Sequence, residues 1–495
     1  MSTQIFRTRP NLLECGSPLF CDLYHLTMAQ TWFLDGKAEE HKVSEAFFRK
    51  CPFGGSYLMA AGLGEFLQWI DNWHFSDDDI ADLRAFTNAD GTPIFGDKFI
   101  NFVKGQKLKV NINTVKEGEI VFPNEPVYSI SGPNWQVEIV EAALLNIFNP
   151  QSLIATKASR MVLASSADNI KRPFLEFGLR RDHELGGFTE TRAAFIGGAT
   201  ATSNTKAARH YNIPAAGTMA HSFIMSYEKE LDAFKAYMRH NPSNTTLLVD
   251  TYDTRQGVQN AIQASLETHI PLMGIRIDSG DLAYWGKEAR RMLDDAGFNK
   301  TKLVASNDLD EHLIENLLLV QKAPYDIMAA GTKLVTAYDT PALGGVFKTK
   351  SYLGNPKIKV AEGKTTIPGA TNVIRIEKNG QFNGDIICKA DGEIIQNGEI
   401  SRNLTSYTLG STNQSRVTFA KGEKAHLLLS PVVRNGNIIG EPELDLHLLQ
   451  QRGQNNLAKF DEAYKRLVNP HIYGVGLEAG LFALQQNLIQ AHRSM

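Results

Sequence analysis

The chain has 495 residues, of which 43% are hydrophobic and 21% are charged, as in ordinary globular proteins. Its 51 Lys and Arg residues against 54 Asp and Glu residues give a formal net charge of −3, which excludes a nucleic-acid binder that relies on a basic excess. The sequence has no run of 18 apolar residues, and its first residues lack the apolar core of a signal peptide, so we expect no membrane partner.

Helical and β-type patterns alternate in the first third of the chain. Residues 1–95 have largely helical spacing, and the polar run Ser76–Asp79 has the composition of a helix start. Residues 107–131 alternate apolar and polar side chains around Gly and Pro, which predicts β-strands. Helical spacing returns over 135–167, where Pro150 predicts a break.

The last third mixes the same two patterns. Residues 346–440 have β-type spacing, with hairpin turns predicted at Asn379-Gly380 and at Asn435-Gly436. The tail, 455–491, has helical spacing that is interrupted at NPHIYGVG.

The four cysteines are too few and too scattered for a disulfide framework or a CxxC zinc site. They are Cys15, Cys21, Cys51 and Cys388. We therefore expect free thiols and a cytoplasmic location.

The middle of the chain repeats one junction, in which a short apolar run ends at small or polar residues before a helical pattern begins. The runs are FLEF, AAFI, IPAA, TLLV, MGIRI, KLVA and DIMAA. The last four junctions, at Asp250, Asp278, Asn307 and Gly331, are about 24 to 29 residues apart, the length of a βα unit. Each cluster alone could simply cap the next helix. Their recurrence predicts strand ends that converge on one active-site rim.

The fold class that follows is α/β, an irregular TIM-like βα barrel with a second β-rich domain built from N- and C-terminal segments. We expect a helical and β-rich region over 1–170 and the barrel with the active site over 171–345. Over 346–495 we expect a β-rich segment and terminal helices that complete the N-terminal domain. A doubly wound open sheet is the alternative arrangement of the same units.

The groups that follow the runs describe a site for an anionic, phosphorylated substrate. Arginine binds carboxylate or phosphate as a two-pronged fork, and glycines after strands let backbone N–H groups approach a phosphate. Clustered carboxylates favour Mg²⁺ over zinc here, because no His/Cys ligand spacing is present. A near-neutral imidazole can act as a base or as a nucleophile toward phosphate. The groups are Arg180, Arg181, Arg276, Asp250, Asp253, Asp278, Asp281, His221, Gly197, Gly198 and Gly331.

A series of ordered segments resembles the nicotinate phosphoribosyltransferase family over nearly the whole chain. Among them are LFCDLYHLTMAQ (19–30), EFGLRR (176–181), GTMAHSF (217–223), GIRIDSGDL (274–282), SNDLDE (306–311), GTKLVT (331–336) and TIPG (366–369). The resemblance implies a funnel-like barrel and a homodimer with active sites at the interface. It also implies a reaction of nicotinate with phosphoribosyl pyrophosphate, which gives nicotinate mononucleotide and pyrophosphate in NAD synthesis. Coupled ATP hydrolysis and Mg²⁺ belong to the implied reaction.

The resemblance also implies roles at the nicotinate ring. His221 matches the histidine that ATP phosphorylates transiently, and Tyr24 matches the tyrosine that covers the pyridine ring from the partner subunit. Phe177 would stack on the other face of the ring. Arg180, or its neighbour Arg181, would hold the carboxylate. Without the resemblance, core packing and solvated surface charge would explain the same residue types.

The remaining roles concern the ribose and its phosphates. Thr218 would lie next to nicotinate, and Arg276 and Asp278 would meet the base and the ribose hydroxyls. Asp250 would lie near the ribose or Mg²⁺, and Asp281 would either bind Mg²⁺ or cap the next helix. The phosphate contacts are assigned to Asn307, Gly331 and Thr332, with Thr366 reaching over from the β-rich domain.

Two features depart from the family pattern, and three rival functions share some of its residues. Pro150 stands where the family usually has an aromatic, and the acidic loop 181–187 has no assigned role. Nicotinamide phosphoribosyltransferase shares the fold and site, although the paired arginines favour a ring that bears a carboxylate. A carboxylate-pair glycosidase or a non-catalytic barrel-based binding protein would leave His221 and Arg276 without a use.

Overall fold

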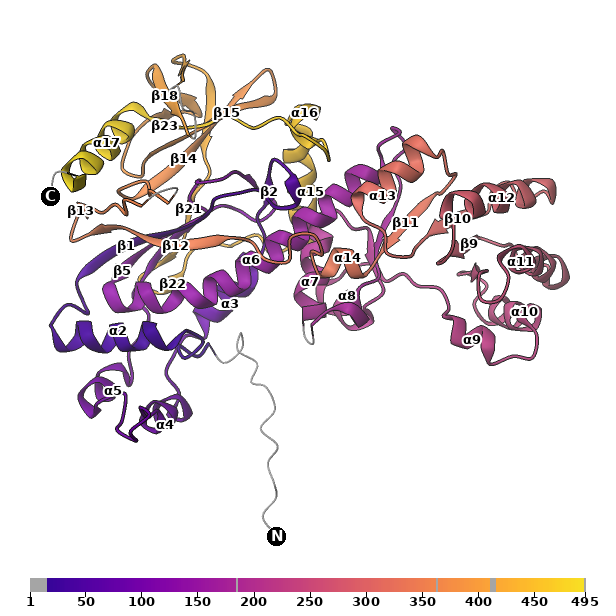
Figure 1. The fold of residues 1–495 in the computed structure, drawn as a ribbon, viewed down its shortest axis with the longest axis horizontal. Helices are drawn as coiled ribbons and strands as arrows, with labels where there is room; N and C mark the ends of the chain where they lie inside the picture. The colour runs from indigo at the N-terminus through magenta and orange to yellow at the C-terminus, as the bar shows by residue number, and fades with distance from the viewer. Residues whose placement is uncertain (1–15, 184–185, 362–363, 410–414, 494–495) are drawn as a thin grey trace, which may run out of the picture. The chain divides into compact units, whose positions relative to one another are not determined.

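The computed structural model describes residues 16–183, 186–361, 364–409 and 415–493 (Figure 1). They form two compact units. The first comprises Met1–Ser152, Leu343–Leu444 and Asn455–Met495, and the second comprises Leu153–Ala342 and Asp445–Gln454. The predicted fold class is confirmed, because a curled parallel half-barrel sheet is joined to a β-rich domain formed from both chain ends. Cys15 and two residues of the 181–187 loop lie outside the described residues.

A six-stranded parallel sheet forms the centre of the second unit, in the order β7-β6-β11-β10-β9-β8. Every pairing within it is parallel, so the carboxyl ends of its strands lie along one edge. The strands are β6 (Phe174–Glu176), β7 (Ala201–Thr202), β8 (Thr246–Leu248), β9 (Gly274–Ile277), β10 (Lys302–Ala305) and β11 (Ile327–Ala330).

Helices follow these strands, and Figure 1 shows α11 and α12 beside β9 and β10. The side chains of Asp253, Asp281 and Asp310 each accept a backbone N–H three residues on, which fixes where three of the helices begin. The helices and helical turns are η2 (Leu179–Arg181), α7 (Gly186–Ile196), α8 (Thr205–Tyr211), α9 (His221–Met225), α10 (Glu230–His240), α11 (Thr254–Thr268), α12 (Leu282–Asp295), α13 (Glu311–Glu315), η3 (Asn316–Val320) and α14 (Thr332–Val335).

Five of the seven apolar runs form strands as predicted, and two do not. AAFI is the last turn of α7, and IPAA makes only an isolated bridge between Thr202 and Ala215. AAFI was predicted as a strand because all four of its residues are buried. A short helical segment without a polar face shows no helical periodicity in the sequence. Strand β7 was missed because it has only two residues.

The first unit contains a seven-stranded and an eight-stranded sheet, ordered β13-β12-β1-β5-β3-β21-β22 and β16-β17-β20-β14-β15-β23-β18-β19. The first sheet is formed by β1 (His41–Phe48), β3 (Asn111–Thr114), β5 (Tyr128–Pro133), β12 (Gly345–Tyr352), β13 (Asn355–Pro356), β21 (Ser430–Arg434) and β22 (Asn437–Ile438). The second is formed by β14 (Thr371–Lys378), β15 (Gln381–Lys389), β16 (Ile395–Gln396), β17 (Glu399–Ile400), β18 (Leu404–Thr408), β19 (Arg416–Phe419), β20 (Lys424–Leu427) and β23 (Val475–Glu478). Strands β2 (Leu58–Met59) and β4 (Ile120–Val121) pair with each other.

Helices surround these sheets, and α6 (Asn134–Ser165) and α15 (Leu446–Ala458) each have residues in both units. The others are α2 (Leu23–Leu34), η1 (Pro52–Gly54), α3 (Leu63–Asp71), α4 (Asp77–Ala85), α5 (Asp97–Val103), α16 (Glu462–Lys465) and α17 (Ala479–Arg493). The predicted start of α4 is confirmed, since Ser76 and Asp79 form a reciprocal capping box.

Two local predictions in this region are wrong. The largely helical interpretation of 1–95 misses β1, whose residues after His41 are all buried, so the strand shows no polar alternation. The predicted break at Pro150 is absent, because α6 continues through it. Pro150 and Asn146, whose carbonyl would accept the missing hydrogen bond, both lie on the exposed side of the helix, where water can replace that bond.

Both predicted hairpin turns are confirmed. Asn379 and Gly380 join β14 to β15 with φ of 53° and 80°, and Asn435 and Gly436 join β21 to β22 with φ of 48° and 75°. Two consecutive positive φ values are typical of the tight turn that matches strand twist.

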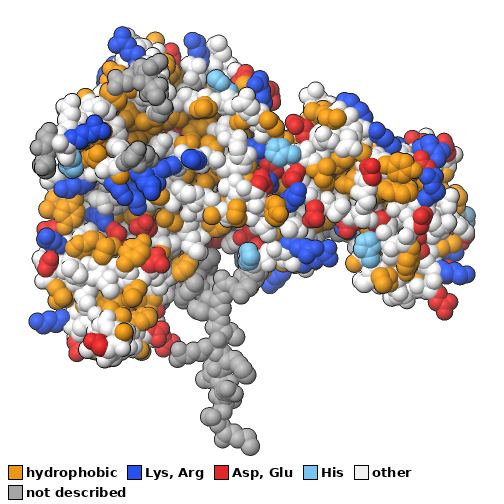
Figure 2. All heavy atoms as spheres, in the orientation of Figure 1, with side chains coloured by type: hydrophobic (Ala, Val, Ile, Leu, Met, Phe, Trp, Pro, Cys, Tyr) orange, Lys and Arg blue, Asp and Glu red, His pale blue; other side chains and the backbone are white. Residues whose placement is uncertain are grey.

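The surface and the thiols agree with the expectations from composition. Figure 2 shows positive and negative side chains interspersed over the face in view. Cys21 and Cys388 are free thiols. Within the described ranges, the helices are too short or too polar to span a bilayer.

A charged cluster is buried inside the β-rich unit. The Arg375 guanidinium is fully buried and lies 2.6 Å from an oxygen of Asp385 and 2.6 Å from an oxygen of Glu119. It also lies 4.9 Å from the ring centroid of Phe382. Because β14 carries Arg375 and β15 carries Asp385, the cluster ties the central hairpin of the larger sheet together.

Replacing Arg375 with methionine is expected to lower the free energy of unfolding by about 3–5 kcal/mol, because two carboxylates would lose the cation that compensates their burial. Urea denaturation measures the change. The matched control is Arg402→Met, which removes a 59% exposed arginine 3.4 Å from Glu478 and should cost at most about 1 kcal/mol. Equal costs for the two variants would contradict the argument.

Candidate active site

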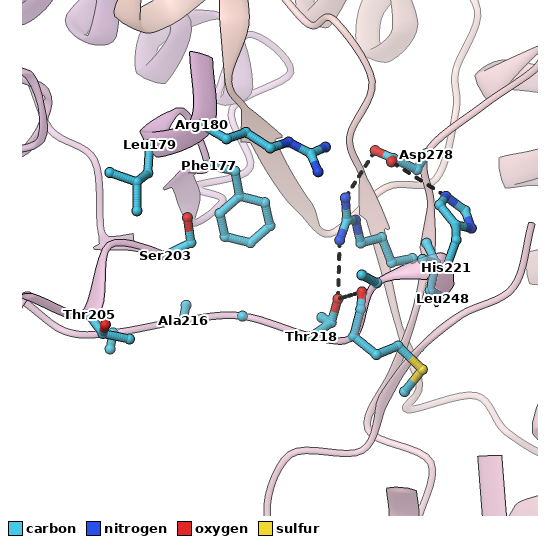
Figure 3. Close-up of a pocket in the computed structure, with 15 residues that line it drawn as sticks. Phe177, Leu179, Arg180, Ser203, Thr205, Ala216, Thr218, His221, Leu248 and Asp278 are labelled. Carbon is cyan, nitrogen blue, oxygen red and sulfur yellow. Dashed lines mark hydrogen bonds and ion pairs between the residues drawn. The ribbon is translucent and has the colours of Figure 1, made fainter. Parts of the chain in front are cut away.

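Two adjoining cavities lie at the carboxyl edge of the parallel sheet. The larger has a volume of about 600 Å³ and the smaller about 130 Å³. Phe177, Arg180, Arg276 and Asp278 line both, so the two spaces share a wall. Figure 3 shows the larger cavity, with Phe177 and Arg180 on one side and Asp278 and His221 across from them. The predicted convergence of strand ends therefore brings most of the expected residues together.

The side chain of Arg276 is held by four neighbours. Its guanidinium donates to the hydroxyl of Ser306 at 2.9 Å and that of Thr218 at 3.3 Å, and lies 3.1 Å from an Asp278 oxygen. It also lies 5.6 Å from the ring centroid of Phe177. A guanidinium fixed beside an aromatic ring forms a wall suited to a flat, negatively charged ring.

Ser306 connects the two charged groups of this wall. Its hydroxyl accepts from Arg276 and donates to Asp278 Oδ1 at 2.5 Å, and its side chain is 4% exposed. The sequence interpretation gave Ser306 no role of its own, although it opens the Ser306-Asn307-Asp308 cluster that follows β10.

His221 is the first residue of α9 and remains accessible, with 41% of its side chain exposed. Its Nδ1 lies 3.1 Å from the hydroxyl of Thr251, and its Nε2 lies 3.9 Å from Asp278 Oδ2. A carboxylate on that side favours the tautomer with the proton on Nε2, so that the Thr251 hydroxyl donates to Nδ1. The ring can then exchange a proton on one side and use a lone pair on the other.

The smaller cavity is polar and is lined by the ends of β10 and β11. Asn307 and Asp308 both have positive φ, 94° and 44°, in a left-handed region that costs free energy for residues other than glycine. At Gly331 a Cβ atom would lie 2.9 Å from the carbonyl oxygen of Phe177, so a side chain would not fit. Thr332 and Arg181 complete the charged and hydroxyl-bearing lining.

The arginine pair is divided between the two spaces. Arg180 lines both cavities, whereas Arg181 lines only the smaller one. Both side chains extend from the exposed turn η2 that follows Phe177. This placement favours Arg180 over Arg181 as the residue that reaches a ligand in the larger cavity.

Asp250 and Asp281 have different surroundings. Asp250 Oδ2 accepts the Asp278 N–H at 2.9 Å and the Ser279 hydroxyl at 2.6 Å, while its buried Oδ1 has no hydrogen-bond partner among the described residues. Such an orphan oxygen is a suitable ligand for Mg²⁺ that is also held by substrate phosphates. Asp281 caps α12 by accepting the Tyr284 N–H at 3.0 Å. Neither Asp250 nor Asp281 lines either cavity.

Tyr24 and Thr366 belong to the first unit. The Tyr24 side chain is 49% exposed beside a separate cavity of about 410 Å³. Thr366 is 2% exposed, and its hydroxyl accepts the Lys359 N–H at 3.0 Å, so in this conformation it does not face solvent. The roles implied for these two residues stay predictions.

One group of three side chains in the described part of the chain, His25, Glu138 and Glu141, has ligand atoms within 4.8 Å of one another. The Asp22 N–H donates to His25 Nδ1 at 3.1 Å, so the proton of the neutral ring lies on Nε2, the atom that faces the carboxylates. Glu138 is also paired with Lys42. A metal ligand needs a ring nitrogen without a proton and a carboxylate that is not already paired. The contacts of His25 and Glu138 therefore argue against a metal ion there.

Several lining residues were missing from the sequence interpretation. They are Leu179, Ser203, Thr205, Ala215, Ala216, Gly217, Met219, Ala220 and Leu248 in the larger cavity, and Asp308 in the smaller. Ser203 follows the short strand β7, so the signal that could have found it was the polar Thr202-Ser203-Asn204 cluster. The apolar lining of the larger cavity carries no sequence signal, because alanines and leucines there look like ordinary core.

Comparison with known proteins covers most of the chain. Residues 19–149 match the model of the nicotinate phosphoribosyltransferase N-terminal domain, 173–340 that of the nicotinate phosphoribosyltransferase family, and 371–485 that of the C-terminal domain. The chain belongs to the nicotinate phosphoribosyltransferase family.

Named members of the family are similar over long stretches. Nicotinate phosphoribosyltransferase of Bacillus subtilis is 38% identical over 488 residues, 96% of each chain. Nicotinate phosphoribosyltransferase pncB2 of Mycobacterium tuberculosis is 38% identical over 372 residues, 74% of this chain and 78% of that one. The crystal structure of human nicotinic acid phosphoribosyltransferase matches with a TM-score of 0.80 and 25% identity, covering 94% of this chain and 99% of that chain.

A pair of acidic residues flanks the turn that carries the two arginines. Burial, and then the charge of Asp182, raise the pKa of Glu190 to about 8. Burial also raises the pKa of Asp182 to about 6. In the unfolded chain Glu190 ionises near 4.5, so between about pH 4.5 and 8 the unfolded state releases a proton that the folded state keeps, and folding stability falls as pH rises.

A glutamine at position 190 cannot ionise, so Glu190→Gln is expected to remove the fall in folding stability that the wild type shows as pH rises. The variant should gain melting temperature relative to the wild type at pH 9 and gain less or nothing at pH 5. Thermal unfolding at both pH values measures the difference, with the exposed Glu228→Gln as the control. Parallel pH profiles for wild type and Glu190→Gln would contradict the assignment.

Proposed function

We propose that this protein is a nicotinate phosphoribosyltransferase that joins nicotinate to phosphoribosyl pyrophosphate and releases nicotinate mononucleotide and pyrophosphate, a step of NAD synthesis. The observation that carries the proposal is the pair of adjoining cavities with a shared wall of Phe177, Arg180, Arg276 and Asp278. The larger space suits a flat ring, and the smaller, polar one suits phosphate. The names of the relatives support the same reaction.

Nicotinate would occupy the larger cavity, with its ring against Phe177. Arg180 would bind the ring carboxylate as a two-pronged donor, because its side chain reaches into this space from η2. Thr218 lies beside Arg276 and could bond to the same end of the ring. The ring nitrogen would then face the wall shared with the smaller cavity.

The phosphoribosyl group would lie across the shared wall. Asp278 would accept bonds from the ribose hydroxyls, since a carboxylate can accept from two donors. The strained turn at Asn307 and the close approach at Gly331 place backbone groups at the smaller cavity, where Thr332 adds a hydroxyl for the 5′-phosphate. Thr366 would contribute only after its bond to Lys359 opens.

Bond exchange occurs at C1 of the ribose. The C1–O bond to pyrophosphate breaks, positive charge develops on the ribose, and the nitrogen of the ring forms the new bond to C1. The chain's task is positioning and the stabilisation of charge. Arg276 is already fixed by Ser306, Thr218 and Asp278, so little reorganisation is needed as the reaction proceeds.

We assign Mg²⁺ to Asp250, whose buried Oδ1 lacks a partner in the described residues and would have to turn toward the cavity to reach the ion. Bound there with the pyrophosphate of the substrate, the ion would supply positive charge to the leaving group. The N-cap bond of Asp281 leaves that residue a secondary candidate.

ATP would act through His221. The lone pair of Nδ1 is the nucleophilic position of the favoured tautomer once the Thr251 hydroxyl turns away from it, and Asp278 faces the opposite nitrogen. Phosphorylation would add negative charge beside the shared wall and so change how tightly Arg276 and its neighbours hold the substrates.

A homodimer would complete the site by bringing Tyr24 of one copy over the nicotinate ring of the other. The 49% exposure of the Tyr24 side chain leaves the ring free to take that place. The free thiols of Cys21 and Cys388 support a reducing, cytoplasmic location. Nicotinamide is not favoured as the substrate, because the relatives are named for nicotinate and because Arg180 lines the larger cavity.

A product assay on the purified protein tests the function. With phosphoribosyl pyrophosphate, Mg²⁺ and ATP, we expect mononucleotide from nicotinate and not from nicotinamide. In His221→Ala the stimulation by ATP should disappear, while some synthesis without ATP should remain, because His221 does not hold the ring. Product from nicotinamide alone would move the protein to the sister activity, and no product from either base would sink the proposal.

Arg180→Ala is expected to raise the KM for nicotinate by about 10- to 100-fold, as the loss of a charged hydrogen bond predicts. Arg181→Ala is the matched control and should raise it by no more than about threefold, because Arg181 does not line the larger cavity. Steady-state kinetics with varied nicotinate separates the two. The reverse order would mean that Arg181 is the carboxylate ligand.

A further inference from the structure

Glu176 is a buried carboxylate with a position beside the site and no part in the reaction described above. It is the last residue of β6, it directly precedes Phe177, and it is 1% exposed. Its Oε1 accepts the backbone N–H of Gly178. Its Oε2 accepts the hydroxyl of Thr191 on α7, at 3.1 Å, and the hydroxyl of Thr202 on β7.

These contacts attach one turn to two other elements, α7 and β7. Phe177 continues the sheet by donating its N–H to Ala330 at 2.8 Å, and the chain then leaves the sheet at Gly178. From that point the turn is closed by the Arg181 N–H, which donates to Gly178 C=O at 2.7 Å. Glu176 is the side chain that connects the start of this turn to α7 and β7.

The turn has little freedom on its other side. At Gly178 a Cβ atom would lie 2.1 Å from a methyl carbon of Val335, so the backbone is packed directly against α14. Phe177 and Arg180, on either side of this point, line both cavities. A small change in the direction of the Gly178 N–H therefore moves the ring and the guanidinium together.

We propose that Glu176 is a positioning residue, which fixes the turn from Phe177 to Arg180 and thereby sets the affinity for the carboxylate-bearing ring. The effect on affinity rests on the proposed function; the fixing of the turn does not. A carboxylate suits this place because it accepts from several donors at once and because hydrogen bonds to a charged acceptor are stronger than neutral ones.

Two variants remove the interaction in different ways. Glu176→Gln keeps the shape but replaces one of the two acceptor oxygens with an NH₂ group, so that either the Gly178 N–H or the two threonine hydroxyls lose their acceptor. Thr202→Val keeps the carboxylate and removes one of its donors, together with the acceptor of the Asn204 N–H. The matched control is Thr200→Val. The Thr200 hydroxyl donates to the C=O of Phe174, which lies on β6 as Glu176 does, but it does not contact Glu176.

Hydrogen exchange measures the turn without any substrate. In both test variants we expect the amides of 178–182 to exchange about tenfold faster or more, with unchanged exchange in β9 and β10 and in the Thr200→Val control. Unchanged exchange of the turn in both test variants would overturn the proposal. If Glu176→Gln fails to fold, Thr202→Val decides.

Kinetics measures the consequence for affinity. We expect the KM for nicotinate to rise by about tenfold in Glu176→Gln, with a smaller change in the KM for phosphoribosyl pyrophosphate. In an Arg180→Ala background the same substitution should raise the KM for nicotinate by only about twofold, because the guanidinium that it positions is already gone and only the Phe177 ring remains. Full additivity of the two substitutions would contradict action through Arg180. A wild type that makes no product would sink the proposed function, and the exchange result alone would then decide the role of Glu176.

Discussion

Parallel pairing of six short strands is the constraint on which the site depends. Because each strand of the order β7-β6-β11-β10-β9-β8 runs in the same direction, whatever residue follows a strand is delivered to one edge. Phe177 follows β6, Asp278 follows β9 and Ser306 follows β10, and their side chains meet although they are far apart in sequence. The chemistry then depends on short side-chain bonds at that edge, above all those that hold Arg276.

The two units use buried charge in different ways. In the β-rich unit, Arg375 and its carboxylate partners are enclosed by aromatic rings and serve the stability of the sheet. At the carboxyl edge of the parallel sheet the pairing is incomplete: the buried Oδ1 of Asp250 has no partner in the described residues, and His221 keeps much of its ring exposed. Incomplete pairing of this kind is what allows a ligand or an ion to be bound there.

Much of the architecture could be predicted from the sequence, because the junctions after TLLV, MGIRI, KLVA and DIMAA repeat at the length of a βα unit. The failures have physical causes. Strand β1 and the end of α7 are buried on all sides and therefore lack the periodicity that distinguishes strand from helix. Ser306 and Glu176 were overlooked because their importance lies in what they bond to, and a sequence without an alignment does not show contacts between distant segments.

The chain order of the β-rich unit has a consequence for biosynthesis. Strand β1 pairs with β12, and β15 pairs with β23, whose residues 475–478 lie near the end of the chain. On a ribosome, one edge of β1 must therefore wait for β12, and the eight-stranded sheet cannot close until residues 475–478 have been translated. Residues 153–342 of the parallel-sheet unit emerge as one uninterrupted segment and can begin to fold earlier. The unfinished edges of β1, which awaits β12, and of β3, which awaits β21, are then the surfaces that a nascent chain would need to keep from aggregating.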